Sequence, residues 1–314
     1  MTPAGPDISE IRALRDAIVD DITATPVLRC AALETLLGND TEVYAKLEFL
    51  QRTGTFKARG ALANLRSLTR TQLEAGVTAV SAGNHAIATA YAANAMGTTA
   101  KVVMIRAANP SRVATCRSYG AEVVLADDVH EAFAVAERIK DEEGRYFVHP
   151  FEGRQVALGT GTVGLEICEQ VEGFDTLIVP IGGGGLIGGI SNAVKQLRPD
   201  VEIIGVEPEG ADTMHRSRAA GKPQGIDRVT TIADSLGSPF AMPYSFALAQ
   251  QNVDRLALVS DEQLRRTMGF MFRAMKIAVE PACTASTAAL LWPLRNALLG
   301  KRVVLLMCGM NIDC

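Results

Sequence analysis

The chain has 314 residues, of which 48% are hydrophobic and 21% charged, a profile typical of a globular protein rather than a disordered or fibrous one. With 31 basic and 35 acidic residues the net charge is −4, which argues against a nucleic-acid-binding surface. The N-terminal segment is acidic and lacks the basic start and apolar run of a signal peptide. We therefore expect a cytoplasmic protein, long enough for two domains or one large one.

Two long stretches without Asp, Glu, Lys or Arg raise the question of a membrane span. Residues 77–100 and 176–194 are rich in Gly, Ala, Ser, Thr and Asn, so neither is the dense apolar run that a spanning helix needs. The six cysteines show no C-x-x-C spacing, and the thiols of a cytoplasmic protein stay reduced. The sequence thus predicts no membrane partner and no disulfide framework.

Helical and strand patterns alternate along almost the whole chain. A helical pattern opens the chain at Ile8, Ile11, Leu14 and Ile18, and another follows Lys57. Strands are expected in a series of short apolar runs, which are residues 43–47, 77–80, 101–105, 122–125, 177–181, 202–206 and 302–307. This alternation predicts an α/β fold in which helices cover both faces of parallel sheets.

The sequence Thr-Gly-Thr-Phe-Lys at residues 53–57 places a lysine in an apolar setting. Most lysines are solvated surface residues, but small and apolar residues surround Lys57, and Arg59 is the only other charge nearby. A lysine held against apolar neighbours loses some of its preference for the protonated form, and the neutral amine attacks aldehydes. Lys57 is therefore a candidate for imine chemistry.

The sequence Ser-Ala-Gly-Asn-His at residues 81–85 follows a predicted strand and precedes a predicted helix. Asn84 offers both a donor and an acceptor, which suits a phenolic oxygen or a substrate carboxylate. The alternative is that Asn84 only caps the helix that begins at His85. His85 is one of four histidines, and their scatter argues against a histidine-based metal site.

Four consecutive glycines, Gly182 to Gly185, separate a predicted strand from a predicted helix. Backbone N–H groups and a helix N-terminus would converge there on an anion, as in a phosphate site. The spacing also satisfies the G-x-G-x-x-G pattern of dinucleotide-binding proteins, with Glu207 where a ribose-binding acid would be. A third interpretation is a glycine turn that only permits close packing of strand and helix. The dinucleotide interpretation assigns no role to Lys57.

Cys308 directly follows the predicted strand at residues 302–307 and precedes Gly309. Parallel sheets bind ligands at the carboxyl ends of their strands. A buried free cysteine is more often a packing residue, but a thiol can also serve as a neutral partner for a pyridine nitrogen. Taken together, the lysine, the asparagine loop, the glycine loop and the cysteine indicate a site for pyridoxal phosphate.

These four motifs resemble those of the fold-type II pyridoxal-phosphate enzymes, the tryptophan synthase β-like group. The resemblance is strongest to the serine/threonine dehydratase and serine racemase family, and it extends from Thr25-Pro26-Val27 to Asn311. It implies two open parallel-sheet domains, each with three αβα layers, the cofactor pyridoxal 5'-phosphate and a homodimer. It also implies a small amino acid as substrate.

The resemblance assigns a role to each motif residue. Lys57 is the Schiff-base lysine and the catalytic base, and Phe56 lies beside the cofactor ring. Asn84 contacts the 3-oxygen of the ring, Cys308 contacts its pyridine nitrogen, and Glu280 lies close to the ring. The phosphate-binding positions are Gly182, Gly183, Gly184, Gly185 and Leu186, and the substrate-binding positions are Ser81, Ala82, Gly83, Asn84 and His85.

The implied reaction removes water from a β-hydroxy amino acid and yields a 2-keto acid and ammonia. Lys57 takes the α-proton and the β-hydroxyl leaves, with help from the cofactor phosphate. L-Threonine or L-serine is the expected substrate, and a hydroxyaspartate-like or phenylserine-like amino acid is the alternative. A neutral thiol at the pyridine nitrogen makes the ring a weaker electron sink, which suits elimination better than transamination.

The chain departs from the resembled family at several positions. Serine racemases carry a second serine in the asparagine loop, where this chain has Ala82, so racemisation is disfavoured. A cation site found in some relatives would use Glu207 and a nearby carbonyl, but Thr213 stands where another acid is expected, so no metal is predicted. Residues 239–244 do not match the expected glycine-rich stretch and lie where substrate specificity is set. Because the chain ends soon after Asn311, no C-terminal regulatory domain is expected.

The domain organisation is expected from the order of the strand–helix units. A large cofactor-binding domain would comprise residues 1–69 plus 149–314, and an inserted small domain, residues 70–148, would contain three strands and move over the active site. Two functions of other classes stay open. A nicotinamide oxidoreductase explains only the glycine loop and Glu207, and a non-catalytic binding protein on the same fold explains none of the reactive residues.

Overall fold

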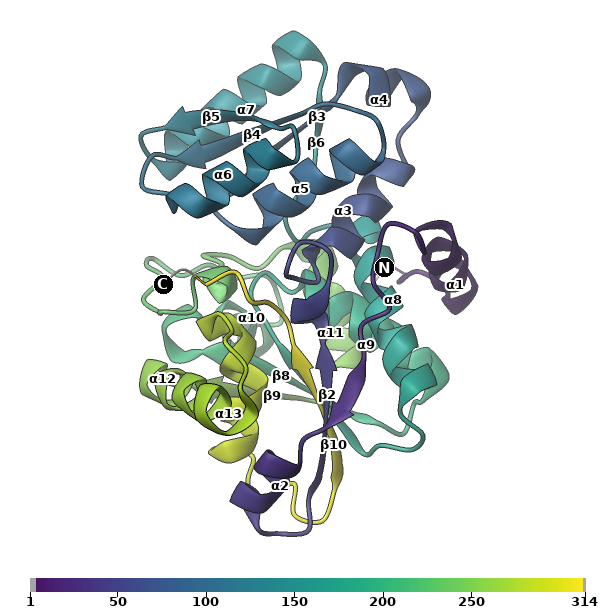
Figure 1. Ribbon diagram of the computed structural model, residues 1–314, viewed down its shortest axis with the longest axis vertical. Coiled ribbons are helices and arrows are strands. Elements are labelled where there is room, and N and C mark those ends of the chain that lie inside the picture. The colour runs from purple at the N-terminus through teal and green to yellow at the C-terminus, as the bar shows by residue number, and fades with distance from the viewer. Residues whose placement is uncertain (1–3, 313–314) are drawn as a thin grey trace.

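The computed structural model describes residues 4–312, which form two open β-sheets (Figure 1). The larger sheet has the strand order β1-β2-β10-β7-β8-β9 and the smaller sheet the order β5-β4-β3-β6. The strands of the larger sheet are β1 (Val27–Arg29), β2 (Glu42–Leu47), β7 (Thr176–Pro180), β8 (Glu202–Pro208), β9 (Arg255–Val259) and β10 (Arg302–Met307). Those of the smaller sheet are β3 (Val77–Val80), β4 (Ala100–Ile105), β5 (Glu122–Ala126) and β6 (Tyr146–Phe147).

Helices separate most of these strands. They are α1 (Ile8–Ala17), α2 (Ala31–Leu37), α3 (Lys57–Arg66), α4 (Arg70–Ala75), α5 (Asn84–Ala95), α6 (Pro110–Ser118), α7 (Val129–Glu143), α8 (Arg154–Gln170), α9 (Gly185–Leu197), α10 (Thr213–Ala220), α11 (Pro243–Asn252), α12 (Asp261–Phe270) and α13 (Ala285–Leu291). Short helical turns occur at Glu48–Leu50, Glu209–Ala211, Asp234–Leu236, Met271–Met275 and Pro281–Thr284. The α/β fold class predicted from the sequence is confirmed.

The strand pairing brings the glycine loop and Cys308 together at the carboxyl ends of the strands of the larger sheet. Within both sheets the neighbouring strands are parallel, except that β1 runs antiparallel to β2. Strand β10 lies between β2 and β7, with Val303 paired to Val43 on one side and to Thr176 on the other. The carboxyl ends of β7 and β10 therefore meet, and with them the glycine loop and Cys308.

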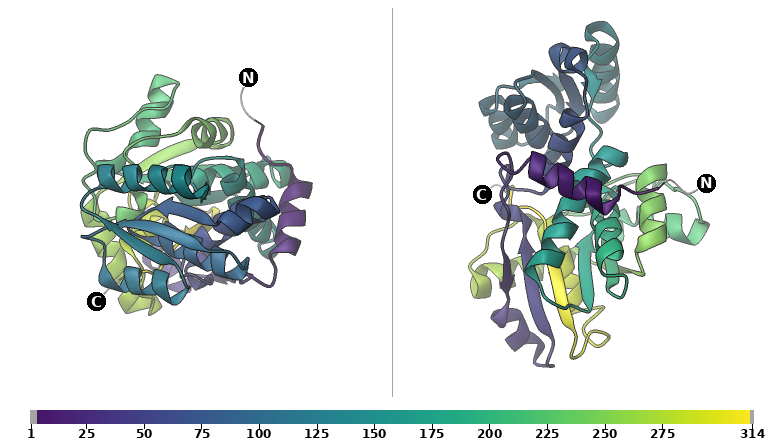
Figure 2. Two further views of the ribbon diagram at one scale, coloured as in Figure 1. Left: turned by 90° about the horizontal axis from the view of Figure 1, so that it is seen from above. Right: turned by 90° about the vertical axis from the view of Figure 1, so that its right-hand side faces the viewer.

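Helices cover both faces of the larger sheet (Figure 2). Helices α8, α9 and α11 pack together on one face, and α13 packs against β7, β8, β9 and β10 on the other. In the smaller sheet, α5 and α6 lie on one face and α7 on the other. The smaller sheet has four strands rather than the expected three, because the short strand β6 pairs with β3.

Helix α3 connects the two sheets. It contacts α5, next to the smaller sheet, and α8, next to the larger one. Its buried residues Leu62 and Leu65 belong to the core that also contains Val77 and Val102 of the smaller sheet. A separate core contains the strands of the larger sheet together with α9 and α13. The first residue of this connecting helix is Lys57.

None of the helices formed by residues 4–312 is long and apolar enough to cross a membrane. Five cysteines fall within this range, and all five are free thiols. The sixth, Cys314, lies outside the described residues.

Candidate active site

The turn that precedes Lys57 is attached to the end of β10. The backbone N–H of Phe56 donates to the carbonyl oxygen of Cys308 at 3.3 Å, and Thr55 forms an antiparallel bridge with Gly309. These bonds bring Lys57 and Cys308 together although they are far apart in the sequence. The Lys57 Nζ lies 5.2 Å from the centre of the Phe56 ring, so the ring covers one side of the amine.

Lys57 has no ionic partner among residues 4–312. Its Nζ donates to a neutral acceptor, the carbonyl oxygen of Pro150, at 2.6 Å. Burial lowers the pKa of the Lys57 ammonium to about 8, because an unpaired cation is disfavoured away from water. A usable fraction of the amine is therefore neutral near physiological pH, as attack on an aldehyde requires.

The glycine loop follows β7 as expected, and its conformation requires glycine. Gly184 has φ +90°, and it is the N-cap of α9, a conformation that L side chains rarely adopt. A Cβ on Gly183 would lie 2.2 Å from the ring of Phe151, and one on Gly185 would lie 2.3 Å from the Phe151 carbonyl oxygen. The loop thus packs closely on Phe151, and the N-terminus of α9 presents its N–H groups at the end of the sheet.

Asn84 is the first residue of α5 and does not cap the helix with its side chain, since Gly83 occupies the N-cap position. The interpretation of Asn84 as only a helix cap is therefore wrong. Its Nδ2 donates to both carboxylate oxygens of Glu280 at 3.0 Å and to the Ser235 hydroxyl at 3.2 Å. Its Oδ1 accepts from Asn311 at 2.8 Å. The buried amide thus joins the start of α5 to three segments that lie far away in the sequence.

The residues on either side of Asn84 differ in accessibility. Ser81, Ala82 and Gly83 are half-buried and precede the N-terminus of α5, where an anion is favoured by the helix dipole. His85 is buried, and its Nε2 bonds to the carbonyl oxygen of Val148 at 2.8 Å. Burial lowers the pKa of His85 to about 3, so this imidazole is neutral.

Glu280 and Cys308 are both buried at the same end of the larger sheet. Burial raises the pKa of the Glu280 carboxyl to about 7, although the hydrogen bond from Asn84 opposes the shift. The hydrogen bond with Cys283 and burial together raise the pKa of the Cys308 thiol. Cys308 is therefore a neutral thiol, as expected for a partner of an unprotonated pyridine nitrogen.

One cavity unites most of the predicted site residues. It is lined by Phe56, Lys57, Asn84, Pro180, Gly182, Gly183, Gly184, Leu186, Ser235, Leu236, Glu280, Ala282 and Cys308. The cavity offers an amine, a side-chain amide, a neutral thiol and a glycine-lined helix N-terminus. These groups fit the aldehyde, the 3-oxygen, the ring nitrogen and the phosphate of pyridoxal phosphate. Gly185 lies behind this wall against Phe151.

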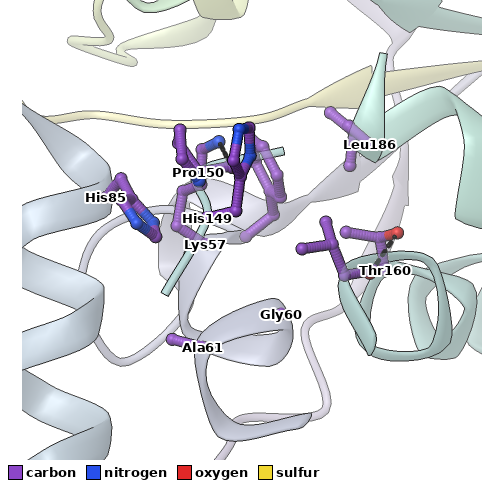
Figure 3. A pocket seen from close by; sticks show the side chains of 10 residues that line it. Lys57, Gly60, Ala61, His85, His149, Pro150, Thr160 and Leu186 are labelled. Atoms are coloured by element: carbon purple, nitrogen blue, oxygen red, sulfur yellow. Dashed lines mark hydrogen bonds between the residues drawn. The ribbon is translucent and has the colours of Figure 1, made fainter. Parts of the chain in front are cut away.

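An adjoining cavity shares Phe56, Lys57 and Leu186 with the first one (Figure 3). It is lined by Phe56, Lys57, Gly60, Ala61, His85, His149, Pro150, Val156, Thr160 and Leu186. Lys57 therefore faces both cavities. Ser81, Ala82 and Gly83 line neither of them, although they lead directly into Asn84 and His85.

Several lining residues were not predicted from the sequence. Ser235 belongs to none of the four motifs, yet its hydroxyl accepts a hydrogen bond from Asn84. His149 and Pro150 follow β6 and line the second cavity beside Lys57. In the sequence, His149 and Pro150 directly follow the predicted strand–helix units of the small domain. This position indicates a role in the site, because ligand-binding residues gather at the carboxyl ends of parallel strands.

The Glu207 carboxylate is bonded to the first turn of α10. This carboxylate is fully buried and accepts from the backbone N–H groups of Met214 (2.7 Å) and His215 (2.9 Å), and it bonds to His215 Nδ1 at 2.7 Å. It thus caps α10 and is not open to a ribose, which removes the residue that supported a dinucleotide site. No group of three metal-ligating side chains is found among residues 4–312.

Comparisons with known proteins agree with this geometry. The family described as "Pyridoxal-phosphate dependent enzyme" matches residues 18–309. The chain is 53% identical to a phenylserine dehydratase of Ralstonia pickettii, over 98% of this chain and 94% of that protein. It is 35% identical to an L-threonine ammonia-lyase of Thermotoga maritima, over 98% of this chain and 76% of that protein.

Solved structures give the same result. The structure of maize serine racemase superposes with a TM-score of 0.94 at 33% identity and covers 99% of this chain and 95% of its own. A threonine deaminase from Solanum lycopersicum superposes with a TM-score of 0.91 at 30% identity, over 99% of this chain and 92% of its own. The cofactor of these enzymes is pyridoxal 5'-phosphate. The chain is a member of the pyridoxal-phosphate dependent enzyme family.

Proposed function

We propose that the protein is a pyridoxal-phosphate-dependent dehydratase that converts a β-hydroxy amino acid into a 2-keto acid and ammonia. The observation that carries the proposal is the position of Lys57. It is an amine without an ionic partner among residues 4–312, with a pKa of about 8, in one cavity with Asn84, the glycine loop and a neutral Cys308. The phenylserine dehydratase at 53% identity and the L-threonine ammonia-lyase at 35% identity are named for the same type of elimination.

Each wall of the cavity has a proposed task in holding the cofactor. Gly182, Gly183, Gly184, Gly185 and Leu186 bind the phosphate with the N–H groups at the start of α9. Asn84 donates to the 3-oxygen, with Glu280 behind it, and Phe56 packs beside the ring. The bound cofactor supplies an electron-withdrawing ring that makes the α-proton of an attached amino acid removable.

Lys57 performs the proton transfers. As a neutral amine it removes the α-proton of the substrate and becomes an ammonium. The C–O bond then breaks, the oxygen keeps the electron pair, and the ammonium returns a proton to it, so that water leaves. Hydrolysis of the resulting enamine gives the 2-keto acid and ammonia. The N–H groups around Ser81, Ala82, Gly83, Asn84 and His85 hold the substrate carboxylate.

Two residues favour elimination over related reactions. Cys308 is a neutral thiol, so it does not hold the ring nitrogen protonated, and a prompt departure of the hydroxyl is favoured over a long-lived carbanion. Ala82 has a methyl group where a racemase would need an acid–base hydroxyl on the opposite face of the substrate. Racemisation and transamination are thus expected to be minor reactions.

The preferred substrate is proposed to carry an aryl group at its β-carbon, as phenylserine does. The Phe151 ring packs on the glycine loop, and the Phe240 ring lies 6.3 Å from it, centre to centre. Phe240 is 41% exposed and belongs to the segment 239–244, which departs from the threonine-dehydratase pattern. Two neighbouring aromatic rings, one of them packed on the glycine loop, favour an aryl substituent, as does the name of the 53% identical relative. L-Threonine and L-serine are expected to react more slowly.

Residues 70–148 are proposed to move as one domain over residues 1–69 and 149–314. This proposal is supported by the separate sheet of that segment. Its main core also includes Leu62 and Leu65 of α3, so α3 would form the contact across which the segment moves. A fall in hydrogen-exchange rate at residues 81–85 when substrate binds would support it, and unchanged exchange would contradict it. A homodimer in the cytoplasm is proposed from the family resemblance, and light scattering of the purified protein tests the dimer.

The experiment that tests the dehydratase proposal is the visible spectrum of the purified protein with pyridoxal phosphate, followed by an assay for ammonia. We expect a visible band, and release of ammonia and keto acid from phenylserine, L-threonine or L-serine. Lys57→Ala is expected to lose both, whereas the exposed-lysine control Lys140→Ala keeps both. A visible band with no ammonia from any of these substrates would refute the dehydratase, and a colourless protein that binds a dinucleotide would refute the cofactor site as well.

A further inference from the structure

The imidazole of His149 lies beside Lys57 and has no task in the reaction described above. It lines the cavity shared by Lys57, Pro150, Thr160 and Leu186 (Figure 3). The next residue, Pro150, accepts the hydrogen bond of the Lys57 Nζ at 2.6 Å. His149 is therefore held next to the amine that performs the proton transfers.

The backbone determines the tautomer of His149. Its Nδ1 accepts from the N–H groups of Phe151 at 3.3 Å and Glu152 at 3.0 Å. A ring nitrogen that accepts two N–H groups carries no proton, so the proton of the neutral ring resides on Nε2. Burial lowers the pKa of His149 to about 4, which keeps the ring neutral. The Phe151 ring, at 4.8 Å and nearly perpendicular, also restrains its orientation.

His85 provides an internal comparison on the other side of the same cavity. Its Nε2 already bonds to the carbonyl oxygen of Val148. His149 Nε2, in contrast, has no hydrogen-bond partner within residues 4–312, and its ring is only half-buried. The cavity is thus lined by one imidazole whose Nε2 is committed to the backbone and by one whose Nε2 has no partner among residues 4–312.

We propose that His149 Nε2–H donates a hydrogen bond to the β-oxygen of the substrate as the C–O bond breaks. The inference rests on the proposed dehydratase function. The electron pair of the C–O bond passes to oxygen, and the hydrogen bond stabilises the negative charge that develops there. The proton that completes the water comes from Lys57, which took it from the α-carbon. His149 keeps its own proton, because a neutral imidazole is a hydrogen-bond donor and not a strong acid.

The test compares two leaving groups on one carbon skeleton. Chloride is a good leaving group and needs neither a proton nor a hydrogen-bond donor, whereas hydroxide needs both. Loss of the His149 donor should therefore slow the reaction of L-serine and leave that of 3-chloro-L-alanine nearly unchanged. We expect His149→Phe to lower kcat for L-serine by about 100-fold, the typical effect of removing one such donor. The rate with 3-chloro-L-alanine is expected to change by less than about 3-fold, within the scatter of indirect effects. His149→Gln retains an N–H donor and is expected to recover part of the rate with L-serine.

The visible band of the bound cofactor is measured on each variant to compare cofactor loading. Equal losses with both substrates would show a structural role and overturn the inference, as would an unchanged rate with L-serine. If the wild-type protein releases ammonia from 3-chloro-L-alanine and from a β-hydroxy amino acid, the dehydratase proposal stands whatever the variants do. If the wild-type protein releases none from either, both proposals fall.

Discussion

Helix α3 carries a fully buried cation, Arg59, and a half-buried one, Lys57, and their partners differ in kind. Arg59 is fully buried and bonds to Glu48 at 2.8 Å and to Glu166 at 2.6 Å, and Glu166 also bonds to Lys46 at 2.6 Å. Two cations and two carboxylates thus form a paired cluster. Lys57, two residues earlier, donates its hydrogen bond to the neutral carbonyl oxygen of Pro150. The pairing pattern thus distinguishes the ion-paired Arg59 from Lys57, the proposed catalytic amine.

The consequences for protonation differ accordingly. Burial alone would lower the pKa of Arg59, but the two carboxylates raise it above its ordinary value. At Lys57 desolvation outweighs the attraction of Cys308 and Glu280 and lowers the pKa to about 8. A charge without a partner is costly to keep protonated. Lys57 is therefore a usable base, while Arg59 holds the start of its helix in place.

The largest effect is expected for Lys57→Met, which removes the amine and keeps the length of the side chain. The elimination rate is expected to fall by at least about 10⁴-fold, because both the covalent attachment and the base are lost. The free energy of unfolding of the cofactor-free protein is not expected to fall, since no ion pair is broken and a charge that is costly to keep away from water is removed. Ammonia release and urea unfolding measure the two effects. A large loss of stability would contradict the distinction between the two cations.

The next effect is expected for Arg59→Met, which leaves Glu48 and Glu166 with only Lys46 between them. Removing one member of a buried ion cluster costs about 3–5 kcal/mol, because an uncompensated charge stays buried. Urea unfolding of the cofactor-free protein measures this loss. The control is Arg70→Met, whose side chain is 93% exposed and should change stability by less than about 0.5 kcal/mol. Equal effects of the two substitutions would refute the argument.

Glu280 is a buried carboxylate without a cationic partner among residues 4–312, so it tests whether an unpaired buried charge shifts its pKa as Lys57 does. Its pKa is raised from 4.5 to about 7, so the folded state binds a proton that the unfolded state has lost. The associated stability is fully present below pH 4.5 and is lost as the pH rises through 7. Glu280→Gln is expected to remove this loss, which amounts to about 3 kcal/mol. Unfolding free energies of the cofactor-free protein at about pH 4.5 and about pH 7.5 measure it. The exposed substitution Glu209→Gln should leave the pH dependence unchanged.

Much of the fold and the site was predictable from the sequence, because local patterns carried the information. Short apolar runs marked most strands, and the motifs that follow them meet because parallel strands end at one edge. Strands β1, β6 and β9 were not predicted. The first two have three and two residues, too short for a periodic pattern. Strand β6 also depends on its pairing with β3, which lies far earlier in the chain.

The buried charges and single polar residues were the least predictable part. Lys46, Glu48 and Arg59 look like surface residues in the sequence, because charged side chains are rarely buried without partners. Their burial depends on Glu166, which only the tertiary fold brings near. Ser235 and His149 are ordinary residues until the fold places them around the active-site cavities. No short sequence motif specifies these contacts between residues that are distant in the chain.

The smallest effect is expected for an ion pair that bridges distant segments and whose carboxylate is exposed. Arg112 of α6 bonds to Asp234 at 2.8 Å and to the carbonyl oxygen of Asn311 at 3.1 Å, next to Ser235 of the cofactor cavity. The Asp234 side chain is 56% exposed, so water and salt screen the pair. Asp234→Asn is expected to lower the unfolding free energy by less than about 1 kcal/mol.

If residues 70–148 close over the substrate, the same substitution weakens the closed state. We then expect KM to rise about 2- to 5-fold, which corresponds to less than about 1 kcal/mol, with the visible band of the cofactor unchanged. In the wild-type protein, added salt should raise KM towards the value of the variant, because it screens the same exposed pair. If Asp234→Asn lowered the unfolding free energy by several kcal/mol, this pair would contribute as much to stability as Arg59 and its carboxylates. The argument that exposure to solvent weakens an ion pair would then be wrong for this protein.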